Sequence, residues 1–228
     1  MIKKILLWTL MAIVLIIGIL FINLKVFMKR GSVVTKGIPI ENYQSNNSAL
    51  FVIDIQEYTT GVVSINEVFK KEAVDLIPKI NRITEKSVES GIPVIYIRSE
   101  ISNPLINLIN SSMSVGSPGA QLDARLNIVS DFIVTKEKQD AFSNPKLDSI
   151  LIRNEISKLF VVGLDAAFCV NSTIEGAMNR DYKVVAISDA IISNPDTAKI
   201  QMLEEYANKG VDIFDTKEFI EDIAGDRL

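Results

Sequence analysis

The sequence predicts an α/β domain in which a mostly parallel sheet of about six strands lies between two layers of helices, preceded by one N-terminal transmembrane helix. Three observations lead to this prediction. They are an uncharged apolar stretch near the N-terminus, a series of short and nearly continuously apolar segments rich in β-branched residues, and amphipathic segments between several of them. Alternation of strands and helices is typical of a parallel sheet covered on both faces, and 228 residues suffice for one such domain.

The N-terminal segment has no charged residue from Ile5 to Leu24, which is about the length that a helix needs to cross a bilayer core. A cleaved signal peptide is the alternative, but the small-residue cleavage pattern is missing. We expect a transmembrane anchor over residues 1–24, a polar linker over 25–47 and the folded domain over 48–228. Basic residues flank the span on both sides and leave its orientation open; the larger number after the span favours a cytoplasmic domain.

Six apolar segments of the domain are predicted to be strands buried on both faces. They cover residues 49–55, 92–99, 131–136, 158–164, 183–190 and 211–216. Between them, apolar residues recur at helical spacing over 67–90, where Gly91 ends the helix, and two further helices are predicted over 169–180 and 196–208.

Composition excludes several classes of function. The net charge is −4 and the isoelectric point is about 5.1, so the chain is a poor match for the phosphate backbone of nucleic acids. The chain has one cysteine and no histidine, which excludes an internal disulfide, a histidine-containing catalytic triad and the usual zinc sites. No spaced acidic cluster indicates a Mg²⁺ or Ca²⁺ site, so we expect neither a metal nor a cofactor.

Three potentially reactive side chains fall at carboxyl ends of predicted strands, where parallel sheets place their ligand sites. Asp54 ends the first strand, Lys136 ends the third, and Cys169 follows the fourth across a short loop, at the start of a helix. A helix N-terminus and a nearby ammonium favour a thiolate, and an aspartate could act as the general base in place of histidine. Backbone N–H groups of the loop and of Cys169 could form an oxyanion hole.

Each of these residues also has an ordinary structural interpretation. A single cysteine on an apolar face is more often part of the core than a nucleophile. An aspartate after a strand is usually a cap, and a lysine at a strand end is usually solvated. The order and the sequence context of the three residues decide between the interpretations.

The chain resembles the isochorismatase-like cysteine hydrolases, a family that includes nicotinamidases and N-carbamoylsarcosine amidase. The resemblance covers residues 48–216 and rests on "ALFVIDIQ", "GIPVIYIRSE", "GSPGAQLD", "IVTKEKQDAF" and "VVGLDAAFCVNSTIEGAMNRDYKVVAISDA". It implies that Asp54 is the general base, Lys136 the stabiliser of the thiolate and Cys169 the nucleophile. It also implies a cis peptide bond between Leu164 and Asp165, which turns the N–H of Asp165 toward that of Cys169 as an oxyanion hole.

The reaction implied by the resemblance is hydrolysis of an amide or carbamoyl C–N bond of a small molecule through a thioester, with a homo-oligomer as the expected assembly. Related nicotinamidases hold a metal with histidines, which this chain lacks. Asp165 stands where relatives more often have a small or hydroxyl residue, so its carboxylate could narrow the pocket. Two alternatives remain open: ether hydrolysis of the isochorismatase type, and a catalytically silent, membrane-anchored binding module of the same fold.

Overall fold

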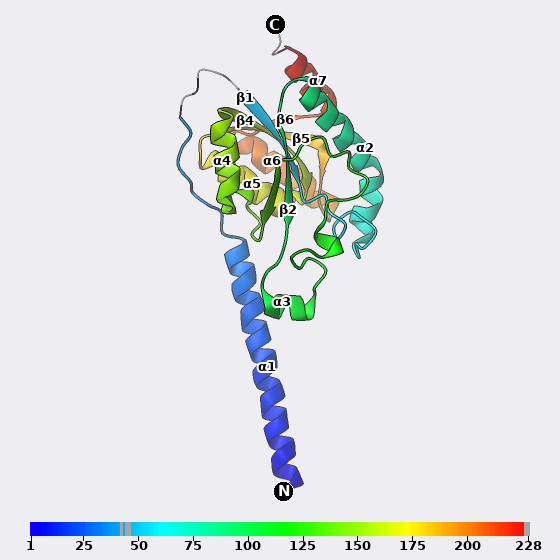
Figure 1. The fold of residues 1–228 in the computed structure, drawn as a ribbon, viewed down its shortest axis with the longest axis vertical. Coiled ribbons are helices and arrows are strands. Elements are labelled where there is room, and N and C mark those ends of the chain that lie inside the picture. The colour runs from blue at the N-terminus through cyan, green and yellow to red at the C-terminus, as the bar shows by residue number, and fades with distance from the viewer. Residues whose placement is uncertain (42, 44–46, 226–228) are drawn as a thin grey trace.

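A computed structural model describes residues 1–41, 43 and 47–225. A long N-terminal helix, α1 (Ile2–Gly31), extends from a domain built around one sheet (Figure 1). No residue of α1 is buried, and the helix is long and apolar enough to cross a membrane, a property that a signal sequence shares. The predicted apolar helix is therefore present as a candidate span.

The described part of the domain contains one sheet of six strands in the order β3-β2-β1-β4-β5-β6, and all of its strand pairs are parallel. The fold prediction is confirmed. The strands are β1 (Asn47–Ile53), β2 (Val94–Ser99), β3 (Ile133–Lys136), β4 (Ile156–Leu164), β5 (Lys183–Ile192) and β6 (Asp212–Phe214).

Helices cover both faces of the sheet and create two hydrophobic cores. Successive residues of β1 alternate between them, with Phe51 on one face and Leu50 and Val52 on the other. The Phe51 face is covered by α4 (Pro145–Arg153), α5 (Asn171–Met178) and α6 (Asp196–Asn208). The opposite face is covered by α2 (Glu67–Glu89) and α7 (Thr216–Gly225), as Figure 1 shows.

The structure adds three short helices to the predicted set. They are α3 (Pro104–Ile109), α4 and α7, each of ten residues or fewer, and such short segments give a weak periodic signal. The helix predicted over 169–180 also begins differently. A π-helical turn, Ala166–Val170, precedes α5, so Cys169 lies in this turn rather than in the first turn of an α-helix.

The N-terminal part of the predicted linker is ordered helix. Residues 25–31 continue α1 to Gly31, and the chain beyond it is fixed to the domain at two described positions. Thr35 bonds to the carboxylate of Asp140, and the Ile40 N–H donates to the Arg180 carbonyl oxygen at 2.9 Å. The candidate span is thus joined to the domain through specific contacts.

Candidate active site

The structure brings Asp54, Lys136 and Cys169 together at the carboxyl edge of the sheet. Asp54 directly follows β1 and has a φ of 54°, a left-handed conformation that aspartate tolerates better than most residues. Lys136 is the last residue of β3, and Cys169 lies after β4. At Gly163, a Cβ would lie 2.1 Å from the carbonyl oxygen of Ile53, so glycine allows β4 to approach β1 closely just before the site.

The ammonium of Lys136 is the centre of the site. Its Nζ donates to Oδ2 of Asp54 at 2.9 Å, to Oγ of Ser99 at 2.8 Å and to Sγ of Cys169 at 3.3 Å. The side chain of Lys136 has no exposed surface and that of Asp54 is 6% exposed. An ammonium has three donors, and all three are used here to hold the carboxylate, a hydroxyl and the thiol in one place.

Ser99, the last residue of β2, is a member of the site that the sequence analysis missed. Its hydroxyl accepts from Lys136 and donates to Oδ1 of Asp54 at 3.1 Å, so it connects the two charged groups. The side chain of Gln56 fixes the backbone of Ser99, accepting from its N–H at 2.8 Å and donating to its carbonyl oxygen at 2.9 Å. Asp54 and Lys136 were identified because they stand at the carboxyl ends of strands, and Ser99 stands at such a position as well.

The electrostatics of the site favour a neutral thiol next to an ion pair. Burial disfavours the charged form of Lys136, but the neighbouring Asp54 carboxylate and Cys169 outweigh this effect and raise the pKa of Lys136. Burial and the charge of Asp54 raise the pKa of Cys169 to about 12, although Lys136 acts in the opposite direction. Lys136 thus lowers the pKa of the thiol as expected from the sequence, but burial and the Asp54 carboxylate have the larger effect.

The backbone of the loop after β4 contains the expected cis peptide bond. The peptide bond between Leu164 and Asp165 is cis. Within the described residues, the N–H of Asp165 donates no hydrogen bond. The side chain of Asp165 accepts from the N–H of Ala167 at 2.9 Å and from the hydroxyl of Ser193, so it caps the π-helical turn. This carboxylate is engaged in local structure, which gives a physical reason for an aspartate at this position.

No group of three or more Cys, Asp or Glu side chains in the described part of the chain is arranged to hold a metal ion. The site described above contains one carboxylate, that of Asp54, and it is already paired with Lys136.

Comparison with known proteins identifies the family of this chain. The profile of the isochorismatase domain family matches residues 48–218. The chain belongs to the isochorismatase family. Members of this family are generally hydrolases, and the chain is also similar to a probable inactive nicotinamidase from Arabidopsis thaliana, with 27% identity over 78% of this chain and 97% of that protein.

Solved structures show the same fold in isochorismatase relatives. A cysteine hydrolase from Pseudomonas syringae pv. phaseolicola 1448A has a TM-score of 0.70 at 22% identity, covering 84% of this chain and 99% of its own. N-carbamoylsarcosine amidase from Thermoplasma acidophilum has a TM-score of 0.63 at 25% identity, covering 75% of this chain and 98% of its own. The relatives thus include an amidase and a protein described as probably inactive.

Proposed function

We propose that this isochorismatase-family protein is a membrane-tethered cysteine hydrolase that cleaves an amide or carbamoyl C–N bond of a small molecule. The observation that carries the proposal is the set of three hydrogen bonds from Lys136, which holds the Asp54 carboxylate and the Cys169 thiol beside each other in a buried site. A carboxylate next to a neutral thiol is a base next to its proton donor, which is the arrangement that nucleophilic catalysis requires.

In the first half of the proposed reaction, the Asp54 carboxylate accepts the thiol proton while Sγ of Cys169 attacks the carbonyl carbon. A C–S bond forms, and the carbonyl oxygen becomes an oxyanion that the N–H groups of Asp165 and Cys169 stabilise. Lys136 offsets the negative charge that develops on sulfur. Asp54 then gives its proton to the leaving nitrogen, the C–N bond breaks, and ammonia or an amine departs from a thioester.

In the second half, water attacks the thioester carbon with Asp54 again acting as the base. The C–S bond breaks, the acid product leaves, and the proton returns to Cys169. One carboxylate thus serves both halves, because the chain has no histidine to share the proton transfers.

The test is release of ammonia or amine by the full chain, reconstituted in detergent or vesicles, across a panel of amides, carbamoyl compounds and ureides. We expect turnover of at least one class, and Cys169→Ala should reduce it by roughly 10³-fold or more because the nucleophile is lost. Capture of an acyl group on Cys169, detected by mass spectrometry after acid quench, would identify the thioester. The Ser149→Ala variant serves as the folded control, because Ser149 is exposed on α4 and its hydroxyl bonds only to the Pro145 carbonyl oxygen.

Three other outcomes would contradict the proposal. Hydrolysis of a vinyl ether that survives in Cys169→Ala would favour isochorismatase-type chemistry. Turnover of an amide that persists in this variant would exclude the thioester. Silence across the panel, together with tight binding of one compound, would favour a non-catalytic binding module, the class suggested by the relative described as probably inactive.

The proposal also keeps α1 in the mature protein as a membrane anchor, and we expect homo-oligomers with the soluble domain on the cytoplasmic side. Membrane retention after alkaline carbonate washing, with an intact mass that includes residue 1, supports the anchor. An N-terminus at or beyond residue 25 in the mature protein would identify a cleaved signal peptide instead.

A further inference from the structure

The two longest stretches of this sequence without a charged residue are 5–24 and 101–122. The first is the candidate span. The second connects β2 to β3, lies outside the sheet and contains α3. In a chain in which 23% of the residues are charged, an uncharged run of 22 residues of which most are not buried calls for a physical explanation.

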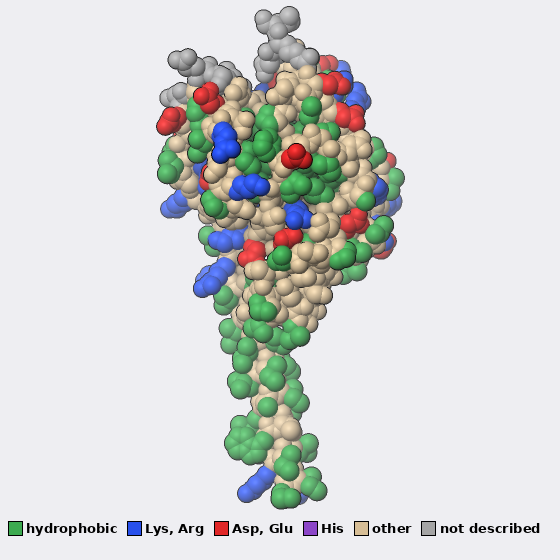
Figure 2. All heavy atoms as spheres, viewed as in Figure 1, with side chains coloured by type: hydrophobic (Ala, Val, Ile, Leu, Met, Phe, Trp, Pro, Cys, Tyr) green, Lys and Arg blue, Asp and Glu red, His purple; other side chains and the backbone are tan. Residues whose placement is uncertain are grey.

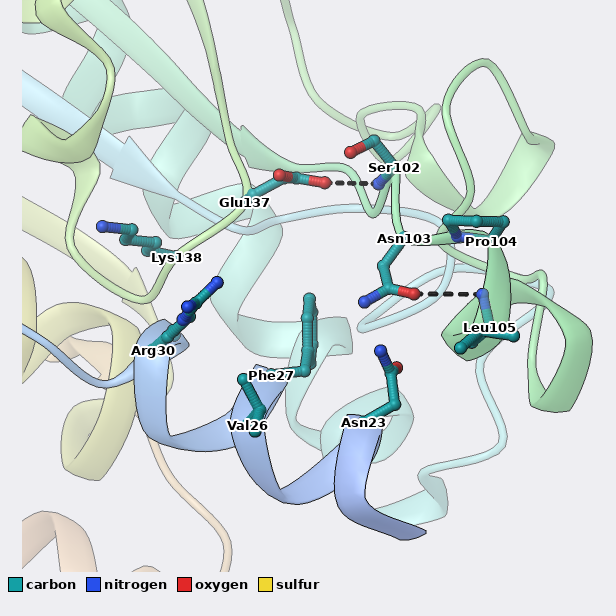
Figure 3. A pocket seen from close by; sticks show the side chains of 11 residues that line it. Asn23, Val26, Phe27, Arg30, Ser102, Asn103, Pro104, Leu105, Glu137 and Lys138 are labelled. Atoms are coloured by element: carbon teal, nitrogen blue, oxygen red, sulfur yellow. Dashed lines mark hydrogen bonds between the residues drawn. The ribbon is translucent and has the colours of Figure 1, made fainter. Parts of the chain in front are cut away.

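The structure places these two stretches against each other. α1 and α3 are in contact, and a groove of about 540 Å³ lies between them. Figure 3 shows Asn23, Val26 and Phe27 of α1 on one side of this groove and Asn103, Pro104 and Leu105 on the other. The uncharged connection therefore meets α1 around residues 23–30, where the apolar stretch ends and the basic residues begin.

The position along α1 fixes the depth of this contact in a bilayer. A helix rises 1.5 Å per residue, so residues 5–24 cover the ~30 Å of a hydrocarbon core. Residues 25–31 then pass through the headgroup layer, and Lys25, Lys29 and Arg30 are exposed there. Figure 2 shows this pattern as a hydrophobic stalk with basic side chains near both ends. Because the groove joins α3 to residues 23–30 of α1, this depth places α3 in the headgroup layer, next to the acyl chains.

The exposed side chains of the uncharged connection suit that position. Leu108 is 73% exposed, Ile109 is 59% exposed and Val115 is 63% exposed, all without a charged residue nearby in sequence. We propose that residues 101–122 form a second membrane contact, in which α3 inserts Leu108 and Ile109 between lipid molecules while the exposed basic residues at the end of α1 bind anionic headgroups.

This contact would turn the candidate active site toward the membrane. Ser102 and Glu137, which follow β2 and β3, line the grooves beside α1, and Phe168, next to Cys169, lines a second groove with Lys25 and Phe27. The carboxyl edge of the sheet therefore lies on the side of the domain where α1 leaves it toward the bilayer. The inference rests on the anchor part of the proposed function and is independent of the amidase reaction.

The experiment uses tryptophan fluorescence of the full chain in vesicles of phosphatidylcholine and phosphatidylglycerol, with or without lipids brominated on the acyl chains near the glycerol. Trp8 is the only tryptophan, so Trp8→Phe provides a silent background. Ile109→Trp and Leu108→Trp report on α3. Ile152→Trp is the matched control, because Ile152 is 57% exposed and lies at the end of α4, just before the amino end of β4.

We expect the Ile109→Trp and Leu108→Trp variants to show blue-shifted emission that is lost to brominated lipid, and the Ile152→Trp variant to show neither. Equal and weak quenching of all three would overturn the inference. A blue shift without lipid quenching would also overturn it, since another protein surface would then cover α3. Unmodified Trp8 separates the two proposals: if Trp8 itself is not quenched, the anchor fails, whereas a quenched Trp8 with unquenched α3 variants rejects the second contact alone.

Discussion

Two charge clusters in this domain share a bridging hydroxyl and differ in the other partners of their cations. The thiol cluster consists of Asp54, Ser99, Lys136 and Cys169, and the arginine cluster consists of Thr35, Asp140, Asp148 and Arg180. In each cluster, a hydroxyl bridges a carboxylate and a cation. Ser99 does so between Asp54 and Lys136, and Thr35 does so between Asp140, at 2.6 Å, and Nη1 of Arg180, at 2.9 Å.

The cations use their remaining donors differently. Arg180 binds Asp148 through Nε at 2.7 Å and Nη2 at 3.1 Å, and its Nη1 also donates to the Gly176 carbonyl oxygen. Its guanidinium lies over the ring of Phe142, 4.4 Å from the centroid. The corresponding donor of Lys136 is directed to a thiol, which is a weak acceptor and a potential nucleophile. Burial and ion pairing alone therefore do not identify a reactive site; the identity of the last partner does.

Replacement of each cation by methionine is the strongest test of this comparison. Lys136→Met leaves the buried Asp54 carboxylate without its counter-ion, so it should lower the free energy of unfolding by about 3 kcal/mol or more. Arg180→Met leaves the partly exposed Asp148 carboxylate unpaired and should lower it by less. The two variants should differ in their rates of turnover. Lys136→Met should lose it almost completely, whereas folded Arg180→Met should keep it, since Arg180 does not touch the thiol.

The measurement is chemical denaturation of both variants, followed by initial rates corrected for the folded fraction. A Lys136→Met variant that is destabilised but fully active would make the two clusters equivalent and remove Lys136 from the proposed mechanism. A folded Arg180→Met variant that loses turnover would show that the arginine cluster also supports the site.

Asp54→Asn should speed alkylation of Cys169 and slow turnover. Its effect on turnover should be smaller than that of Lys136→Met. The Asp54 charge is one cause of the raised pKa of Cys169, so its removal lowers this pKa and increases the thiolate fraction at neutral pH. Alkylation of Cys169 by iodoacetamide should become faster, while turnover falls by roughly 10²- to 10⁴-fold because the base is gone.

The pH profile of alkylation shows in which direction each substitution shifts the pKa of Cys169. With a pKa of about 12 for Cys169, the rate for the unaltered protein should rise about tenfold per pH unit between pH 7 and 10, since only the thiolate reacts. The Asp54→Asn profile should level off at a lower pH, and the Lys136→Met profile should move to higher pH because an opposing positive charge is lost. Superimposable profiles for all three proteins would contradict the proposed electrostatics.

The same contrast explains how much could be predicted from the sequence. Asp54, Lys136 and Cys169 each stand at a strand end or in the loop that follows, and parallel strands bring such positions to one edge, so their proximity followed from local patterns. The arginine cluster joins residues more than 100 positions apart, Thr35 with Asp140 and Arg180, and no local periodicity reports such a contact. The same limit applies to α3, whose position against α1 depends on the tertiary fold.

The position of Cys169 follows more directly from the sequence than its protonation does. Strand order places a side chain, but its protonation depends on how much water the neighbouring loops exclude and on which charge lies nearest. Here burial and Asp54 outweigh Lys136. A residue's position can thus be inferred from the strand pattern before its charge state can.

The smallest expected effect comes from the two bridging hydroxyls. Ser99→Ala removes a donor to Asp54 and an acceptor for Lys136, so kcat/KM should fall about tenfold as the carboxylate and ammonium lose a positioning contact, with about 1 kcal/mol lost in stability. Thr35→Val removes the matching hydroxyl and should lower stability to a similar degree while leaving the kcat/KM of soluble substrates unchanged. Equal kinetic losses in both variants would show that the anchor connection at Thr35 also positions the catalytic groups.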